Sequence, residues 1–259
     1  MAVESRRLSA SLQLIRQVVR IVYGERGESS EMVSAVLFDL DDTMLDRDAS
    51  LLRFLHDQHD RLQPFFGHIL QADYVKRFVE LDAHGYVWKD VVYQKLIEEF
   101  RIQGVSAEAL LEDYITRFHF HCVPVPHLME TVEHLKQHQF KLAVITNGFT
   151  GFQMRNIRAL GIEHCFSEIL VSEQVGRKKP DPGIFHHALD LLGVSPQESM
   201  YVGDHPINDV QASRQIGMIG VWKKSQHWSP PEHADFVIDD LAELKTLTQY
   251  MKLPDERRR

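Results

Sequence analysis

Short apolar runs that alternate with amphipathic stretches predict an α/β protein with a doubly wound parallel sheet. The apolar runs are AVLFDL at 35–40, KLAVIT at 141–146, EILVS at 168–172, SMYVG at 199–203 and MIGVW at 218–222. From residue 141 on, helix-type segments of 8 to 15 residues separate them, which is typical of βαβ units with helices on both faces of the sheet. Ligands bind such sheets at the carboxyl ends of the strands, so the residues after each run are the candidates for a site.

An inserted all-helical domain is predicted between the first and second strands, where about 95 residues lack a comparable apolar run. The stretches 50–63, 72–85, 88–100 and 106–120 have helical apolar spacing, and Gly85 and Gly104 punctuate them. We therefore expect a helical domain over residues 47–126 and an α/β core over residues 32–46 and 127–259.

The composition excludes several functions. The chain has 259 residues, a formal net charge of -8 and a pI near 6.0, which argues against a nucleic-acid-binding surface. No stretch approaches 18 consecutive apolar residues, so no membrane span is expected. Cys122 and Cys165 form neither a disulfide framework nor a CxxC metal pair. A reducing, cytoplasmic setting is the expectation.

Residues 1–31 precede the first strand and differ from the rest of the chain. Leu8, Leu12, Ile15, Val19 and Val22 repeat at helical spacing, which predicts one amphipathic helix, followed by the linker GERGESSE. The Arg-rich, acid-poor start is also compatible with an organelle transit peptide. We expect instead a helix that packs on its own domain or on a second subunit, which leaves a homodimer open.

Three of the predicted strands end in residues that suit a site. They are Asp39 and Asp41, Thr146 and Asn147, and Gly203 and Asp204, all of them polar except the glycine. Lys179 joins them, because Asp181 suits an N-cap and Pro182 a first helical position, which puts a lysine beside the positive end of a helix dipole. Carboxylates, a hydroxyl and an ammonium would then surround one point.

Four aspartates, Asp39, Asp41, Asp42 and Asp46, fall within eight residues of the first strand end. Packed together without a counter-charge they would repel one another and raise each other's pKa. Such a cluster therefore predicts a bound cation or a functional use of the repulsion.

The residues at the ends of the first two predicted strands resemble motifs of the haloacid dehalogenase superfamily of phosphohydrolases. The resemblance as a whole covers residues 35 to about 240. Its first motif, an apolar strand followed by DxDxT, is matched by Asp39, Asp41 and Thr43. Its second, a Ser or Thr that closes the next strand, is matched by Thr146.

The remaining two motifs of the family follow in order. A Lys before Pro ahead of a helix is matched by Lys179, with Lys178 beside it, and GDxxxxD is matched by Asp204 and Asp209 in GDHPIND. Four motifs in the family order form a specific signal. The resemblance implies a Rossmann-like core, and the insertion matches the helical cap of the family.

The resemblance also implies an aspartyl-phosphate mechanism. Asp39 would be the nucleophile, and Asp41 would protonate the leaving oxygen and later deprotonate the attacking water. A Mg²⁺ would be held by Asp39, the backbone carbonyl of Asp41 and Asp204, while Asp209 orients its water shell.

The phosphoryl oxygens would be held, by the same resemblance, by Thr146, the N–H of Asn147 and Lys179. Asp42 and Asp46 are expected to be loop or helix-end charges. True 2-haloacid dehalogenases replace the second aspartate of DxD, so Asp41 favours phosphate chemistry.

The substrate is expected to be a small phosphomonoester of the nucleotide or sugar phosphate type. TNGFTGFQMRNIRALGI and SEQVGRKKPDPGIF are similar to the branch that contains pyrimidine 5'-nucleotidases and acylneuraminate 9-phosphatases. Two alternatives remain: a phosphomutase that uses the same Asp39 and Asp41, and a non-catalytic regulatory protein that keeps the fold.

Specificity is expected in the helical insertion. His84, Tyr86, Trp88 and Lys89 surround Gly85, and a glycine-punctuated turn in a mobile lid is a reasonable place for groups that contact a leaving group. The alternative is that Tyr86 and Trp88 only pack the helices together.

Overall fold

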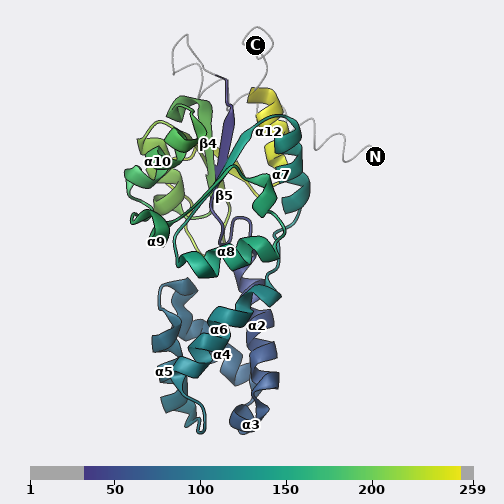
Figure 1. Cartoon of the computed structure of the whole chain (residues 1–259), viewed down its shortest axis with the longest axis vertical. Coiled ribbons are helices and arrows are strands. Elements are labelled where there is room, and N and C mark those ends of the chain that lie inside the picture. The colour runs from purple at the N-terminus through teal and green to yellow at the C-terminus, as the bar shows by residue number, and fades with distance from the viewer. Residues whose placement is uncertain (1–31, 252–259) are drawn as a thin grey trace. The chain divides into compact units, whose positions relative to one another are not determined.

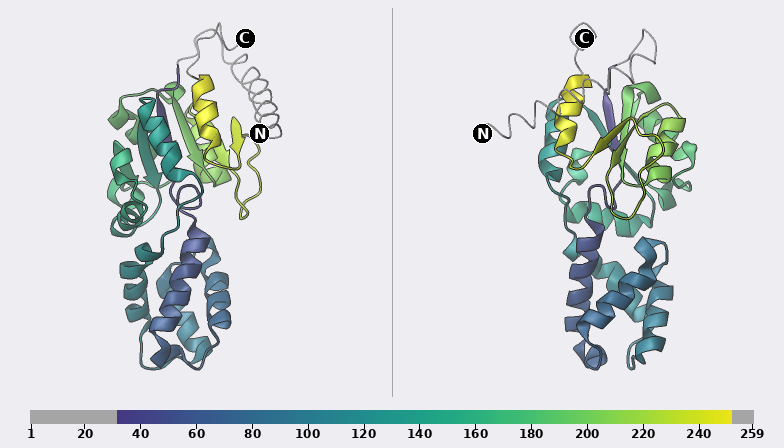
Figure 2. Two further views of the ribbon diagram at one scale, coloured as in Figure 1. Left: turned by 90° about the vertical axis from the view of Figure 1, so that its right-hand side faces the viewer. Right: turned by 180° about the vertical axis from the view of Figure 1, so that it is seen from behind.

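The computed structural model describes residues 32–251, which divide into two compact units. The α/β unit comprises residues 32–44, Val125–Thr150 and 162–251, and the helical unit comprises Leu45–Pro124 and Gly151–Gly161. Figures 1 and 2 show both as ribbons. The helix expected within residues 1–31 lies outside the described residues.

The α/β unit is built on a six-stranded sheet, in which the strands follow the order β3-β2-β1-β4-β5-β6 and every pairing is parallel. The strands are β1 (Ala35–Phe38), β2 (Lys141–Thr146), β3 (Glu168–Val171), β4 (Ser199–Gly203), β5 (Ile219–Lys223) and β6 (Phe236–Ile238). The predicted fold class is confirmed, and five strands lie where the apolar runs placed them. β6 was not predicted, because its three residues give no usable periodicity.

Helices cover both faces of this sheet. In Figures 1 and 2, α7 (Leu128–Gln137) and α12 (Glu243–Met251) lie side by side on one face, and α10 (Pro182–Leu192) covers the other. The short helices of the unit are η3 (Glu163–Cys165), α9 (Ser172–Val175), η4 (Pro196–Glu198), η5 (Pro206–Gln211) and α11 (Ala212–Gln215). No helix of the described residues combines the length and the hydropathy that crossing a membrane requires.

The core under α10 shows why these segments form this layer. Alternate strand residues point to one face of a sheet, and the buried cluster contains Leu37, Ile145 and Tyr201 from neighbouring strands together with Phe185 and Leu189 from α10. Burying each large apolar side chain contributes about 1.5–3 kcal/mol. The cluster therefore fixes α10, and with it the loop that precedes its first turn.

The two ends of α10 were predicted from the sequence. Asp181 is the N-cap and accepts a hydrogen bond from Gly183 N at 2.7 Å, and Pro182 takes the first position. Gly193 ends the helix with a φ of 60°, a left-handed conformation that glycine adopts at little cost. Both predictions are confirmed.

The helical unit contains four long helices in the predicted stretches. Its elements are α2 (Arg47–Arg61), α3 (Gln63–Phe66), α4 (Gln71–Asp82), η1 (Ala83–Gly85), α5 (Lys89–Phe100), α6 (Ala107–Arg117), η2 (Phe118–His121) and α8 (Thr150–Ala159). Asp46 begins α2 by accepting a hydrogen bond from Ala49 N at 2.9 Å, so its expected role as a helix-end charge is confirmed.

Residues 151–161 group with the helices rather than with the sheet, whereas the sequence pattern assigned the whole of 127–259 to the core. Phe152 stacks on Tyr114 with ring centroids 5.2 Å apart and an angle of 16° between the planes. Arg155 Nη2 donates to Ile115 O at 3.0 Å. These contacts join α8 to α6 within the helical unit.

A buried ion cluster joins three segments of the helical unit. Asp82, at the end of α4, lies against the ammonium of Lys89, and Arg47 Nη2 lies 2.7 Å from Asp82 Oδ2. The side chains of Asp82 and Lys89 are each only 2% exposed. Burial acts to raise the pKa of Asp82, but Arg47 and Lys89 outweigh it and the pKa is lowered. Lys89 was expected to contact a leaving group. In the structure its ammonium forms an ion pair with Asp82.

Replacing Lys89 with Met should lower the free energy of unfolding by about 3 kcal/mol, because one side of a buried ion pair is lost. Chemical denaturation measures this change. Lys95→Met, on the exposed side of the same helix, is the matched control and should cost less than about 0.5 kcal/mol. Equal losses in the two variants would contradict a structural role for Lys89.

Candidate active site

The site lies where β1 ends in the middle of the sheet. Phe38 is paired with Val144 of β2 and with Val202 of β4, and the ladder continues to Asp39, whose N–H donates to Val202 O at 2.9 Å. The chain leaves β1 for β2 on one side and, after β3, crosses to β4 on the other side of β1. Ligands bind α/β sheets at such a switch point.

Three buried carboxylates converge at this edge. Asp39 follows β1, Asp204 follows β4, and Asp209 lies in the π-helical turn η5. One oxygen from each lies within 4.8 Å of the others, although the residues are only 7%, 5% and 1% exposed. The sequence predicted this group of acids, and the fold brings them together.

Lys179 supplies the counter-charge. Its Nζ donates to Asp39 Oδ1 and to Asp209 Oδ1, both at 2.6 Å, and to the hydroxyl of Tyr201 at 3.0 Å. Burial acts to lower the pKa of Lys179, but Asp209 and Asp39 outweigh it and raise the pKa well above its usual value. Lys178 is exposed while Lys179 is buried, which separates the two lysines of the third motif.

Asn147 holds the backbone of Lys179 in place. Its Oδ1 accepts from Lys179 N at 2.9 Å and its Nδ2 donates to Lys179 O at 3.0 Å. Thr146, the last residue of β2, is 1% exposed, and Tyr201 donates from its hydroxyl to Ile145 O at 3.0 Å. The end of β2 and the loop before α10 are thereby joined.

Gly203 makes room for Asp209. A Cβ at position 203 would lie 2.4 Å from Asp209 Cβ, which no other residue type can tolerate without moving the backbone. His205 N donates to Asp209 Oδ2 at 3.0 Å, while His205 Nδ1 accepts from Ile207 N and Asn208 N at 3.1 Å each. The imidazole therefore caps η5, and the turn fixes Oδ2 of Asp209 while Lys179 holds Oδ1.

The electrostatics show an excess of negative charge. Burial raises the pKa of Asp39 to about 8, with Lys179 opposing the shift and Asp209 and Asp41 adding to it. Burial and the neighbouring Asp209 and Asp39 raise the pKa of Asp204 to about 9. One ammonium does not compensate three carboxylates.

The arrangement fits a hard divalent cation, which oxygen ligands of this kind prefer. Within residues 32–251, hydrogen bonds engage Asp39 through Oδ1 and Asp204 through Oδ2, so the other oxygen of each is available as a ligand. Asp41 is half-buried and does not belong to the triad, although it is near enough to raise the pKa of Asp39.

Two tryptophans hold Asp204, and sequence reasoning missed both. Trp222 Nε1 donates to Asp204 O at 2.7 Å, and Trp228 Nε1 donates to Asp204 Oδ2 at 3.1 Å. Trp222 pairs with Gly203 across β5 and β4, so the end of the MIGVW run was the available signal. Trp228 lies in the loop after β5, where no pattern marks it.

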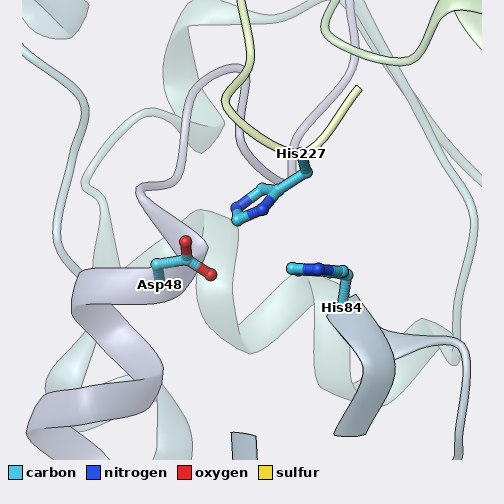
Figure 3. Close-up of side chains that lie close together, drawn as sticks. All are labelled: Asp48, His84 and His227. Atoms are coloured by element: carbon cyan, nitrogen blue, oxygen red, sulfur yellow. The ribbon is translucent and has the colours of Figure 1, made fainter. Parts of the chain in front are cut away.

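A second polar group lies in the helical unit. Figure 3 shows Asp48 at the start of α2 and His84 in η1, where a carboxylate oxygen and a ring nitrogen lie within 4.8 Å. His227, also drawn there, belongs to the α/β unit. Asp48 and His84 are both exposed and supply two ligands, too few for a metal site within this unit.

Comparison with curated proteins finds phosphatases. The chain is 27% identical to the glyceraldehyde 3-phosphate phosphatase of Methanopyrus kandleri over 240 residues, 82% of this chain and 96% of that protein. It is 38% identical to the phosphoserine phosphatase of Thermus thermophilus over 105 residues, 40% of this chain and 42% of that protein.

Solved structures share the fold. A haloacid dehalogenase-type phosphatase from Thermococcus onnurineus superposes with a TM-score of 0.60 at 28% identity, over 83% of this chain and 97% of that one. The hydrolase YfnB of Bacillus subtilis, bound to magnesium, gives a TM-score of 0.64 at 22% identity, over 85% of this chain and 100% of that one.

The family model of the haloacid dehalogenase-like hydrolases matches residues 36–222. This range contains β1 except its first residue, all of β2 to β4, and the three carboxylates with their lysine. The chain therefore belongs to the haloacid dehalogenase-like hydrolases.

Proposed function

We propose that the chain hydrolyses a small phosphomonoester through an aspartyl-phosphate formed on Asp39. The observation that carries this proposal is the buried group of Asp39, Asp204 and Asp209 with the Lys179 ammonium against two of them. The chain is a haloacid dehalogenase-like phosphatase, a phosphoric monoester hydrolase.

Asp39 attacks phosphorus, and the bond from phosphorus to the leaving oxygen breaks. Asp41 gives that oxygen a proton, then takes a proton from the water that attacks the aspartyl-phosphate, which frees phosphate and restores the Asp39 carboxylate. Thr146, the N–H of Asn147 and Lys179 hold the phosphoryl oxygens while charge develops on them.

Mg²⁺ is the proposed cofactor, with Asp39 and Asp204 as ligands together with the backbone carbonyl of Asp41. The ion would supply charge neutralisation for the carboxylates and for the phosphoryl group. Asp209 is proposed to orient the water shell, which is compatible with its two oxygens being held by Lys179 and His205 N.

The substrate is proposed to be a compact phosphorylated metabolite. The relatives are named for glyceraldehyde 3-phosphate, phosphoserine and phosphoglycolate, which favours small esters over nucleotides. The narrower resemblance to pyrimidine 5'-nucleotidases and acylneuraminate 9-phosphatases stays a prediction.

Contacts to the leaving group are proposed for the exposed side chains of η1 and its neighbour. Tyr86 is 64% exposed and His84 is also exposed. Trp88 packs edge-on against Tyr114 at 6.4 Å, and Lys89 is paired with Asp82. Of the two aromatic residues, Trp88 thus fits the packing alternative, and Lys89 fits a structural ion pair. The proposed contacts to the leaving group narrow to His84 and Tyr86.

Asp39→Asn should abolish the release of phosphate from p-nitrophenyl phosphate with Mg²⁺, because the amide does not attack phosphorus. Asp42→Asn is the matched control: it makes the same change three residues away, in a loop position with a φ of 56° that Asn tolerates, and should keep activity. Turnover by Asp39→Asn would contradict the assignment of Asp39 as the nucleophile. Release of phosphate by the parent without an added sugar phosphate separates a phosphatase from a mutase.

In metal-free protein the free energy of unfolding should fall as the pH rises from 5 to 9. The pKa values of Asp39 and Asp204 are raised in the folded state to about 8 and about 9, so the stability they contribute is present at low pH and lost as the pH rises through these values. Mg²⁺ should therefore raise the melting temperature more at pH 8 than at pH 5.

Melting curves across this pH range check the prediction. Asp204→Asn keeps the shape of the side chain without its charge, so its curves should depend less on pH and respond less to Mg²⁺. If Asp204→Asn has the same dependence of melting temperature on pH as the parent, Asp204 is not a source of the loss of stability at high pH.

A further inference from the structure

We infer that Trp228 is a positioning residue that orients the Asp204 carboxylate for cation binding. Its indole N–H donates to Asp204 Oδ2 at 3.1 Å, while Trp222 holds the backbone carbonyl of the same residue at 2.7 Å. Asp204 is thus fixed at two points, one on its backbone and one on its side chain. The inference rests on the proposed cation site.

The chemistry of the donor suits this task. An indole N–H donates one hydrogen bond and accepts none, so it binds one carboxylate oxygen without competing for a cation. With Oδ2 held, Oδ1 is the oxygen of Asp204 left for the ion. Partners of this kind fix ligand orientation, and their loss typically weakens metal binding about 10- to 100-fold.

The indole is itself held by the site. Its ring lies against the imidazole of His205, with centroids 4.4 Å apart, and His205 caps the turn that carries Asp209. Trp228, Asp204 and Asp209 are therefore connected through one turn. A shift of the loop between β5 and β6 would move the N–H away from Oδ2.

The ring can be changed without opening the core. Trp228 is half-buried and lines a cavity of about 660 Å³ together with Pro206, Ile207 and Pro231. Trp228→Phe keeps an aromatic ring against His205 and removes the N–H. We expect this variant to fold.

Titration calorimetry of the metal-free full-length protein with Mg²⁺ measures the effect. Trp228→Phe should raise the Kd for Mg²⁺ by about 10-fold, with kcat for p-nitrophenyl phosphate recovered at saturating Mg²⁺. Trp88→Phe, which alters an indole of the helical unit in contact with Tyr114 and Phe152, is the control and should leave the Kd unchanged.

A double-mutant cycle separates this inference from the proposed function. Trp228→Phe and Asp204→Ala should be non-additive in the denaturation midpoint of metal-free protein, because each of them removes the same hydrogen bond. An unchanged Kd for Mg²⁺ in Trp228→Phe would overturn the positioning role alone. No binding of Mg²⁺ by the parent would overturn the cation site, and the inference with it.

Discussion

The ammonium of Lys179 lies 2.6 Å from both Asp39 and Asp209 in a place where each of the three residues is almost fully buried. Removing ions from water costs several kcal/mol apiece, and only close pairing offsets that cost. The pairing here connects the end of β1, the loop before α10 and the turn after β4, and the first two of these segments are already 140 residues apart in sequence. The position of one ammonium thus decides whether three separate segments can share one edge of the sheet.

The surrounding residues act mainly to keep that ammonium and its partners still. Asn147 forms hydrogen bonds with both backbone groups of Lys179, and the hydroxyl of Tyr201 in β4 accepts a hydrogen bond from Lys179 Nζ. At Gly203 the absence of a side chain leaves the space that Asp209 fills. A site that is already in place before a ligand arrives needs little rearrangement when charge develops. Even so, one ammonium does not balance three carboxylates, and the raised pKa values of Asp39 and Asp204 are what a cation bound beside them, as proposed, would relieve.

Much of this edge could be predicted because it depends on local signals. Apolar runs mark buried strands, and in parallel sheets the residues after them must meet, which is how Asp39 and Asp204 could be placed near each other. Trp228 could not be predicted, because its position depends on the path of an irregular loop. Lys89 was expected to contact a leaving group beside Gly85, yet its burial depends on Asp82 and Arg47, which come from other helices. The apolar periodicity of a sequence predicts which face of a helix or strand is buried. Which side chains of different elements pair depends on the tertiary structure.

The place of β1 in the sheet has a consequence for synthesis of the chain. β1 is the first strand of the described residues to be made, yet its neighbours are β2, about 100 residues later, and β4, which is later still. While the ribosome makes the helices of residues 47–117, which can form from local contacts, both edges of β1 remain without a partner. The aspartates that follow it stay hydrated at that stage and so repel one another little. A nascent chain that stalls before β4 would carry an open apolar strand, the kind of edge through which chains associate wrongly.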